Sequence, residues 1–235
     1  MKTCIEKAFV DITATKYYKY HGLIRPCNIQ PDPECFLVYD TKDPYGPPIT
    51  ISKSAIEWKN REKSGLDYYV AHDSLTGSEY NRYCGQLRWD LGGGWADYWV
   101  GRMFAIWDTS SIPDDALVIS AQIITTASNV KKDSAFSVTI RSGMPTFPHS
   151  PIVDGDFYYL NYTGDYGSTF VVGTGAFVIN LNDLGLPLIN KTGLTKFSLI
   201  SDRDILRLIP YAPESFEFIE FEYGCQLKIT YREKL

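Results

Sequence analysis

The stretch Cys225-Gln226-Leu227-Lys228-Ile229-Thr230-Tyr231, near the end of the chain, decides the fold class. Its larger apolar side chains stand at every second position and alternate with polar ones. Successive side chains of a β-strand point to opposite faces, so this alternation predicts a strand with one buried and one solvated face. Residues 117–127, 136–141 and 219–223 show the same period of two.

The remainder of the chain also favours strands over helices. We expect further strands at residues 9–13, 36–39, 50–52, 68–73, 98–107, 177–181 and 196–201. One short helical turn is expected within residues 181–190, where Pro187 limits its length. Many short strands separated by turns predict an all-β protein, an antiparallel, jelly-roll-like β-sandwich with an N-terminal β-rich arm.

Composition and charge exclude several classes of function. The 235 residues carry 23 Lys and Arg against 28 Asp and Glu, a formal net charge of −5. This balance argues against nucleic acid as a partner, because phosphate binding needs a concentrated basic face. No apolar run approaches the roughly 20 residues of a membrane-spanning helix, so a membrane partner is not expected.

Two segments are predicted along the chain. Residues 66–235 form the sandwich, and residues 1–65 form an arm or small β extension for assembly or attachment. The boundary is placed there because residues 52–65 are charged and lack alternation, and prolines crowd the first fifty residues. The arm should bury its apolar side chains against the sandwich, a second copy or another assembly protein. These side chains are Ile5, Phe9, Val10, Ile12, Phe36, Leu37, Val38 and Ile49.

Cysteines, acidic pairs and the first residues give no sign of a cofactor. Five cysteines without C-x-x-C spacing predict free, partly buried thiols rather than disulfides or a zinc site. The acidic pairs at 154–156 and 202–204 resemble the start of a calcium loop, but Tyr159 stands where an EF-hand needs glycine. We expect solvated turn carboxylates there. Glu6 and Lys7 interrupt any secretory apolar segment, and the free thiols favour folding in a reducing compartment.

No motif in the sequence indicates an enzyme. A G-x-S-x-G elbow, a Walker A loop and an H-E-x-x-H helix are all missing. Gly92-Gly93-Gly94 lacks the strand and helix that flank a phosphate loop, so it is interpreted as a flexible turn. His72, one of three histidines, lies in an aromatic stretch and is interpreted as structural. The chain is therefore expected to be a non-enzyme.

Aromatic side chains are the distinctive feature, at 14% of the residues. Six of them fall in loop-like stretches among Gly, Asp, Asn and Thr. Flat amphipathic rings with polar neighbours suit a glycan-binding or protein-contact surface, because a face stacks while the edge stays hydrated. The alternative is that they cover the ends of the sandwich. The six are Trp89, Trp95, Tyr158, Tyr159, Tyr162 and Tyr166.

Residues 102–116, with the core Trp107-Asp108-Thr109-Ser110-Ser111-Ile112-Pro113, carry a resemblance. With Ala116 to Ala121 in the next strand, they resemble the carbohydrate-binding-module-like β-sandwiches called DNRLRE domains. The resemblance extends over about 66–235, through residues 153–157, 190–193, 201–204 and the last strand. It implies that Asp108 and the following hydroxyls bond the amides of their own turn while Ile112 enters the core.

The resemblance also implies two functions, because such modules occur in phage or viral structural proteins and in secreted surface proteins. The first is a non-enzymatic structural or attachment protein of a virion, a tailed-phage capsid decoration, fibre or tail component that folds in the host cytoplasm. Its partners would be other virion proteins, copies of itself and a host-surface glycan. The alternative is a carbohydrate-binding module of an extracellular protein.

Overall fold

The computed structural model describes residues 43–211 and 213–235, and the chain divides into two compact units between Asp43 and Pro44. Residues 44–235 are all-β and antiparallel, which confirms the predicted fold class. Within the described residues, ten strands form one hydrogen-bonded sheet. The strands are β1 (Tyr45–Ser54), β2 (Glu57–Gly65), β3 (Tyr83–Gly92), β4 (Trp95–Asp108), β5 (Leu117–Lys132), β6 (Ser137–Arg141), β7 (Ser168–Phe170), β8 (Gly175–Asn180), β9 (Leu194–Ser201) and β10 (Ser215–Lys234).

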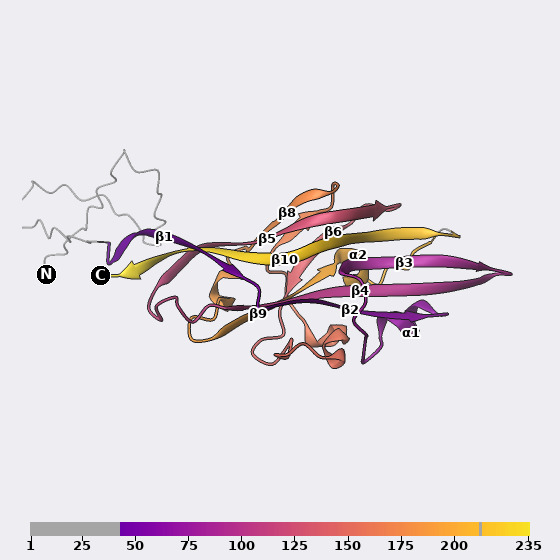
Figure 1. Ribbon diagram of the computed structural model, residues 1–235, viewed down its shortest axis with the longest axis horizontal. Helices are drawn as coiled ribbons and strands as arrows, with labels where there is room; N and C mark the ends of the chain where they lie inside the picture. The colour runs from indigo at the N-terminus through magenta and orange to yellow at the C-terminus, as the bar shows by residue number, and fades with distance from the viewer. Residues whose placement is uncertain (1–42, 212) are drawn as a thin grey trace, which may run out of the picture. The chain divides into compact units, whose positions relative to one another are not determined.

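The sheet folds back on itself into a sandwich. Its strand order is β7-β6-β9-β4-β3-β10-β5-β8, with β1 added on β10 and β2 on β4. The two ends of this order meet, since the hydroxyl of Thr169 in β7 donates to the Val178 carbonyl of β8 at 2.7 Å. The long strand β10 pairs with β3 through its first residues, with β1 through its last and with β5 along both parts. Figure 1 shows β3 and β4 running out together at one end, away from β1.

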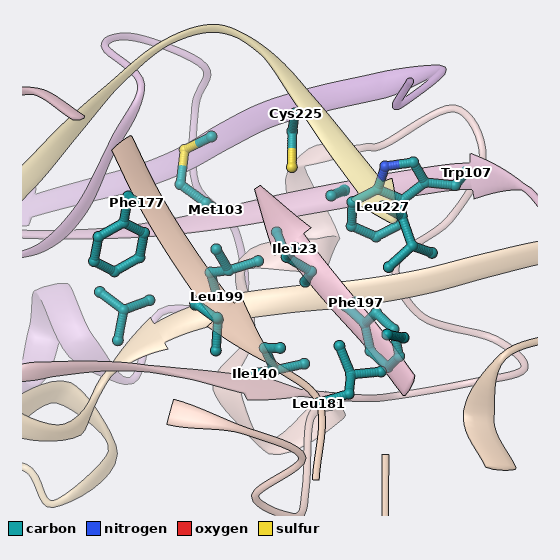
Figure 2. Packing of buried hydrophobic residues seen from close by; sticks show 14 of the residues in the cluster. Met103, Trp107, Ile123, Ile140, Phe177, Leu181, Phe197, Leu199, Cys225 and Leu227 are labelled. Atoms are coloured by element: carbon teal, nitrogen blue, oxygen red, sulfur yellow. The ribbon is translucent and has the colours of Figure 1, made fainter. Parts of the chain in front are cut away.

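The main core lies between the two layers of the folded sheet. Alternating residues of β4 and β9, such as Met103, Trp107 and Leu199, pack against those of β5 and β10, such as Ile123 and Leu227. Figure 2 shows these side chains converging from both layers. The last strand confirms its predicted alternation, because its odd-numbered residues 225–231 are buried and its even-numbered ones are not.

The turn after β4 has the predicted internal bonding. Asp108 Oδ1 accepts from the backbone nitrogen of Ser110 at 3.0 Å and from its hydroxyl at 2.6 Å. Ile112 is buried in the main core. Thr109 is buried as well, and its hydroxyl pairs with that of Thr195 in β9 at 2.7 Å. This turn therefore anchors the layer of β4 and β9 to the following strand.

A third layer covers the outer face of β4. It contains α1 (Tyr68–His72), α2 (Asp202–Ile205) and the short 3-10 helices η2 (Asp154–Phe157) and η3 (Tyr159–Asn161). Phe104 and Ile106 of β4 pack against Ile152 and Tyr162, which places two apolar clusters back to back across the strand. The segment 68–73 is helical, so the strand predicted there is wrong. Asp67 caps this helix by accepting from the nitrogens of Tyr69 and Val70.

The domain boundary predicted at residue 65 falls instead at residue 43, because β1 and β2 belong to the sandwich. The charge of residues 57–63 misled the prediction: Asn60, Arg61 and Glu62 are all buried, and of the three Arg61 contacts the covering layer, through Ile152 and Asp154. Ile49 packs against the main core. The predicted strands at 9–13 and 36–39, three of the cysteines and the other apolar arm residues lie outside the described residues.

Two remaining expectations concern the cysteines and the helix near residue 186. Cys84 and Cys225 are free and buried, as predicted. The helical turn expected within 181–190 is the 3-10 helix η4 (Leu186–Leu188), with Pro187 inside it. No helix among the described residues is long and apolar enough to span a membrane.

Candidate functional site

A groove crosses four neighbouring strands where β3 and β4 leave the sandwich. Strand register places Glu62 of β2, Gly101 of β4, Gly85 of β3 and Phe218 of β10 in one row. Gly101 leaves room above the middle of the sheet, and the ring of Tyr83 occupies it. A Cβ on Gly101 would lie 2.4 Å from that ring, so the glycine is required for the ring to lie there.

The alternation of side chains along each strand determines which residues line the groove. Odd-numbered residues of β3 and β4 share a face with their direct partners on the neighbouring strands, so rings and carboxylates from four strands meet there. The groove has a volume of about 310 Å³. We call it the Glu62 groove; it is lined by Glu62, Tyr80, Asn81, Tyr83, Leu87, Trp89, Leu91, Asp97, Trp99, Phe218 and Glu220.

Three carboxylates line the groove, and they differ in their partners. Asp97 Oδ2 accepts from the indole nitrogen of Trp99 at 2.7 Å, and Glu220 Oε2 accepts from the Asn129 amide at 3.2 Å. Glu62 is 3% exposed, and its Oε2 has no hydrogen-bond partner. Burial raises the pKa of Glu62 to about 7, and the nearby Tyr83 hydroxyl opposes this rise only in part.

The structure does not bring the six predicted aromatic residues to one surface. Trp89 and Trp95 lie on β3 and β4 and are exposed; Trp89 lines the Glu62 groove. Tyr159 is the first residue of η3 in the covering layer, Tyr158 precedes it, and Tyr162 is buried against Phe104. Tyr166 packs on the main core. Glycan binding by these residues stays a prediction, and the two tryptophans are the ones with exposed rings.

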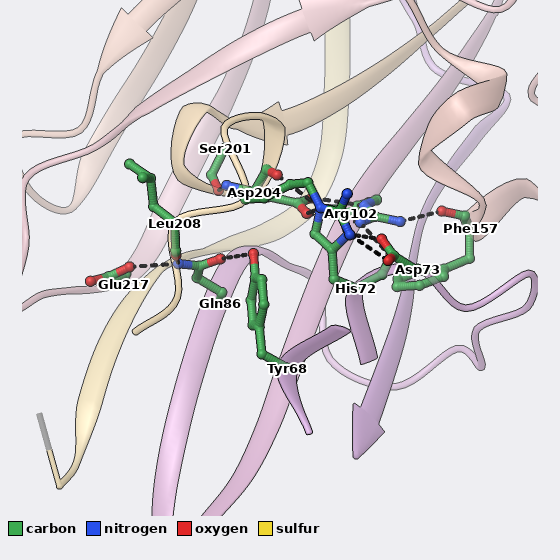
Figure 3. A network of polar contacts seen from close by, with 11 residues as sticks. Tyr68, His72, Asp73, Gln86, Arg102, Phe157, Ser201, Asp204, Leu208 and Glu217 are labelled. Carbon is green, nitrogen blue, oxygen red and sulfur yellow. Dashed lines mark hydrogen bonds and ion pairs between the residues drawn. The ribbon is translucent and has the colours of Figure 1, made fainter. Parts of the chain in front are cut away.

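A second polar cluster is buried between β4 and the covering layer (Figure 3). Arg102 is fully buried, and its Nε and Nη2 donate to the two carboxylate oxygens of Asp204 at 2.7 and 2.8 Å. The same guanidinium donates to the Phe157 carbonyl at 2.6 Å and to the His72 carbonyl at 3.0 Å. Arg102 therefore ties α1, η2 and α2 to one strand.

Charge inside this cluster is balanced by direct pairing. Burial alone would raise the pKa of Asp204, but Arg102 and His72 outweigh it and hold that pKa at about 2. Burial lowers the pKa of His72, but the hydrogen bond and charge of Asp204 outweigh burial, so the net shift is upward. His72 Nδ1 also contacts Asp73 at 2.5 Å. His72 thus has the structural role predicted from the sequence.

The two acidic pairs prove to be half buried rather than wholly solvated. Asp204 is the buried partner of Arg102, and Asp156 accepts from the backbone nitrogens of His149 and Val153 at 3.0 and 2.8 Å. Their companions Asp154 and Asp202 are more exposed. Within the described part of the chain, no group of three or more His, Cys, Asp or Glu is placed to hold a metal ion.

Sequence reasoning missed Glu62, Asp97 and Trp99 as members of one groove. A signal was present, because residues 95, 97 and 99 repeat Trp-x-Asp-x-Trp at strand period, which places an acid between two indoles on one face. Glu62 could not be recognised as a residue that lines the groove, because the stretch around it is charged and was not predicted to be a strand.

Comparisons with known proteins give a likeness to solved structures but no family. No protein-family model and no curated protein matches the chain. The resemblance to DNRLRE domains therefore stays a prediction. Among solved structures, the chain is similar to a chain in the cryo-EM structure of Mud crab tombus-like virus. The identity is 12%, the match covers 94% of this chain and 93% of that chain, and the TM-score is 0.33.

Proposed function

We propose that this protein is a non-enzymatic structural or attachment protein of a virion. Its partners would be copies of itself or other virion proteins, and its working location would be the particle. The observation that carries the proposal is a set of apolar side chains held in solvent by the two paired strands β3 and β4. We call this set the hairpin ridge and define it as Trp89, Leu91 and Trp95.

The hairpin ridge has the composition of a protein contact. Its three side chains are 50%, 57% and 63% exposed, respectively. Tryptophan is enriched among the residues that dominate binding energy, and adjacent exposed apolar groups mark interaction sites. The ridge is built on paired strands, so little conformational entropy is lost when it is covered. An assembling protein needs such a preformed contact.

The non-enzymatic part of the proposal is supported by how the titratable groups of the buried polar cluster are used. His72, Arg102 and Asp204 bind one another and the backbone of the covering layer, and all three are buried. General acid–base catalysis needs a group within reach of a substrate proton. The arrangement here instead holds three segments of chain together.

The alternative function, a carbohydrate-binding module, is favoured by a different observation. In the Glu62 groove, the rings of Trp89 and Trp99 lie near the carboxylate of Asp97. A sugar can stack on an aromatic face while its hydroxyls donate to a carboxylate. A glycan array with the full chain tests this alternative, and a signal that is lost in Trp89→Ser would support it.

Self-association of the purified full chain tests the assembly role. We expect light scattering to show oligomers whose mass grows with concentration, and Trp89→Ser/Trp95→Ser to shift them to monomers. Leu184→Ser is the matched control, because Leu184 is 71% exposed but lies away from β3 and β4. Equal association of the double variant and the wild type would refute the ridge as the contact.

A further inference from the structure

Two buried polar atoms of the Glu62 groove make no well-formed hydrogen bond, although their two side chains interact with each other. They are Oε2 of Glu62 and the hydroxyl oxygen of Tyr83, whose residues are 3% and 4% exposed. A buried polar group without a partner costs roughly 1–3 kcal/mol, and such groups are rare in native proteins. Both side chains line the groove. A ligand that donates hydrogen bonds in the groove would satisfy both atoms.

The groove has the charge of a cation site. Three carboxylates line it, from Glu62, Asp97 and Glu220, and no lysine or arginine does. Two basic neighbours along the chain, Arg61 and Arg82, are engaged elsewhere. Arg61 contacts the Ile152 carbonyl at 2.8 Å and Asp154 at 3.4 Å, and Arg82 lies over the Tyr223 ring at 3.2 Å.

The other walls are aromatic and aliphatic, which favours an organic cation over a metal ion. Tyr80, Trp89, Trp99 and Phe218 contribute rings, and Leu87 and Leu91 contribute alkyl surface. Rings attract cations through their faces and also pack against alkyl chains. A hard metal ion needs a shell of several oxygen ligands, and no such group is present among the described residues.

We propose that the Glu62 groove binds an alkylammonium ion, the group that a lysine side chain carries. The ammonium donates to Glu62 Oε2 and to the Tyr83 hydroxyl oxygen, and the alkyl chain lies between the tryptophan rings. Ammonium has three donors and no acceptor, which fits one carboxylate and one phenol oxygen. The proposal concerns the ligand of this groove and does not depend on the virion role.

Binding should depend on pH through Glu62. The titratable groups that line the groove with it are Tyr80 before β3, Tyr83 of β3, Asp97 of β4 and Glu220 of β10. Because the pKa of Glu62 is about 7 in the free protein, its carboxylate is mostly protonated at pH 6 and mostly ionised at pH 8. Affinity for the cation should therefore rise about tenfold between these two values.

Calorimetric titration of the full chain with n-butylammonium chloride at constant ionic strength tests the proposal. We expect saturable binding in the millimolar range, as one salt bridge and a short alkyl chain provide. n-Butanol, the neutral control, should bind at least tenfold more weakly. Nα-acetyl-lysine-methylamide is the second probe; if it binds more tightly than n-butylammonium, the ligand is a protein side chain, and if less tightly, a free amine.

Variants decide whether the groove is the site. Glu62→Gln should weaken butylammonium binding about tenfold at pH 8 and abolish the pH dependence, while Glu233→Gln, an exposed acid at the end of β10, should change neither. Asp97→Asn provides a second variant, because an amide oxygen can still accept from Trp99, and it should weaken binding severalfold. Equal binding of n-butanol, absence of saturable binding, or an unchanged affinity in Glu62→Gln would each overturn the proposal.

Discussion

Replacing Arg102 with methionine should destabilise the protein more than any single change at its surface. The substitution keeps an apolar side chain in the space but removes four hydrogen bonds, two to Asp204 and one each to the carbonyls of Phe157 and His72. Asp204 stays buried without its main partner. Breaking a buried ion pair by removing one member costs about 3–5 kcal/mol, and we expect about 4 kcal/mol here.

Urea unfolding followed by tryptophan fluorescence measures this loss. At pH 7 the free energy of unfolding of Arg102→Met should be lower than that of the wild type by about 4 kcal/mol. Arg207→Met, which removes an exposed pair with Asp73, should lower it by less than about 1 kcal/mol. Arg102→Met removes the largest interaction that lowers the pKa of Asp204, so this pKa rises, protonation relieves the buried charge, and the loss should shrink as the pH falls toward 4.

A double variant separates pairing from packing. Arg102→Met/Asp204→Leu removes both charges, and it should recover at least half of the stability that the single variant loses, because no unpaired charge remains. A loss below about 1 kcal/mol in Arg102→Met, or no recovery in the double variant, would refute the view that this pair holds the covering layer on β4.

Three further predictions concern the groove and the thiols. Because the folded state raises the pKa of Glu62 from 4.5 to about 7, the folded protein binds more protons than the unfolded chain in this window, so stability should fall as the pH rises from 5 to 8. The free energy of unfolding should fall by at most about 3 kcal/mol, and by about 2 kcal/mol once solvent at the open groove is taken into account. Urea unfolding should show that Glu62→Gln lacks this pH-dependent contribution. Gly101→Ala should cost about 1–3 kcal/mol in the same assay, since its Cβ displaces the Tyr83 ring; an unchanged stability would show that the ring moves freely. Cys84 and Cys225 are buried with raised pKa values, so mass spectrometry should find both unalkylated by iodoacetamide at pH 8 unless urea is added.

The strands of the sheet could be predicted from the sequence wherever apolar and polar residues alternate without interruption. Residues 225–231 of strand β10 are buried at alternate positions, and there the pattern alone defines the two faces. Strand β2 could not be predicted, because its charged residues are buried by pairing with partners far away in sequence: Arg61 contacts residues 79, 152 and 154. Helix α1 has only five residues, too few for a helical period to emerge.

The polar cluster and the groove were hidden for the same reason. Arg102 and Asp204 are 102 positions apart, and nothing local to either residue indicates the other. The groove depends on strand register, which aligns Glu62 with two glycines and Phe218 across four strands. The turn after β4 could be predicted because Asp108 bonds Ser110 within the same few residues.

The central claim is that this protein is a structural component of a virion, and peptide mass spectrometry of gradient-purified particles tests it most directly. Particles are prepared from cells that produce the protein, and copy number is measured against labelled peptides of this chain. We predict that it co-sediments with the particles at a fixed ratio to their main protein through successive gradients. Its absence from the particle fraction, while it is abundant in the same cells, would contradict the claim.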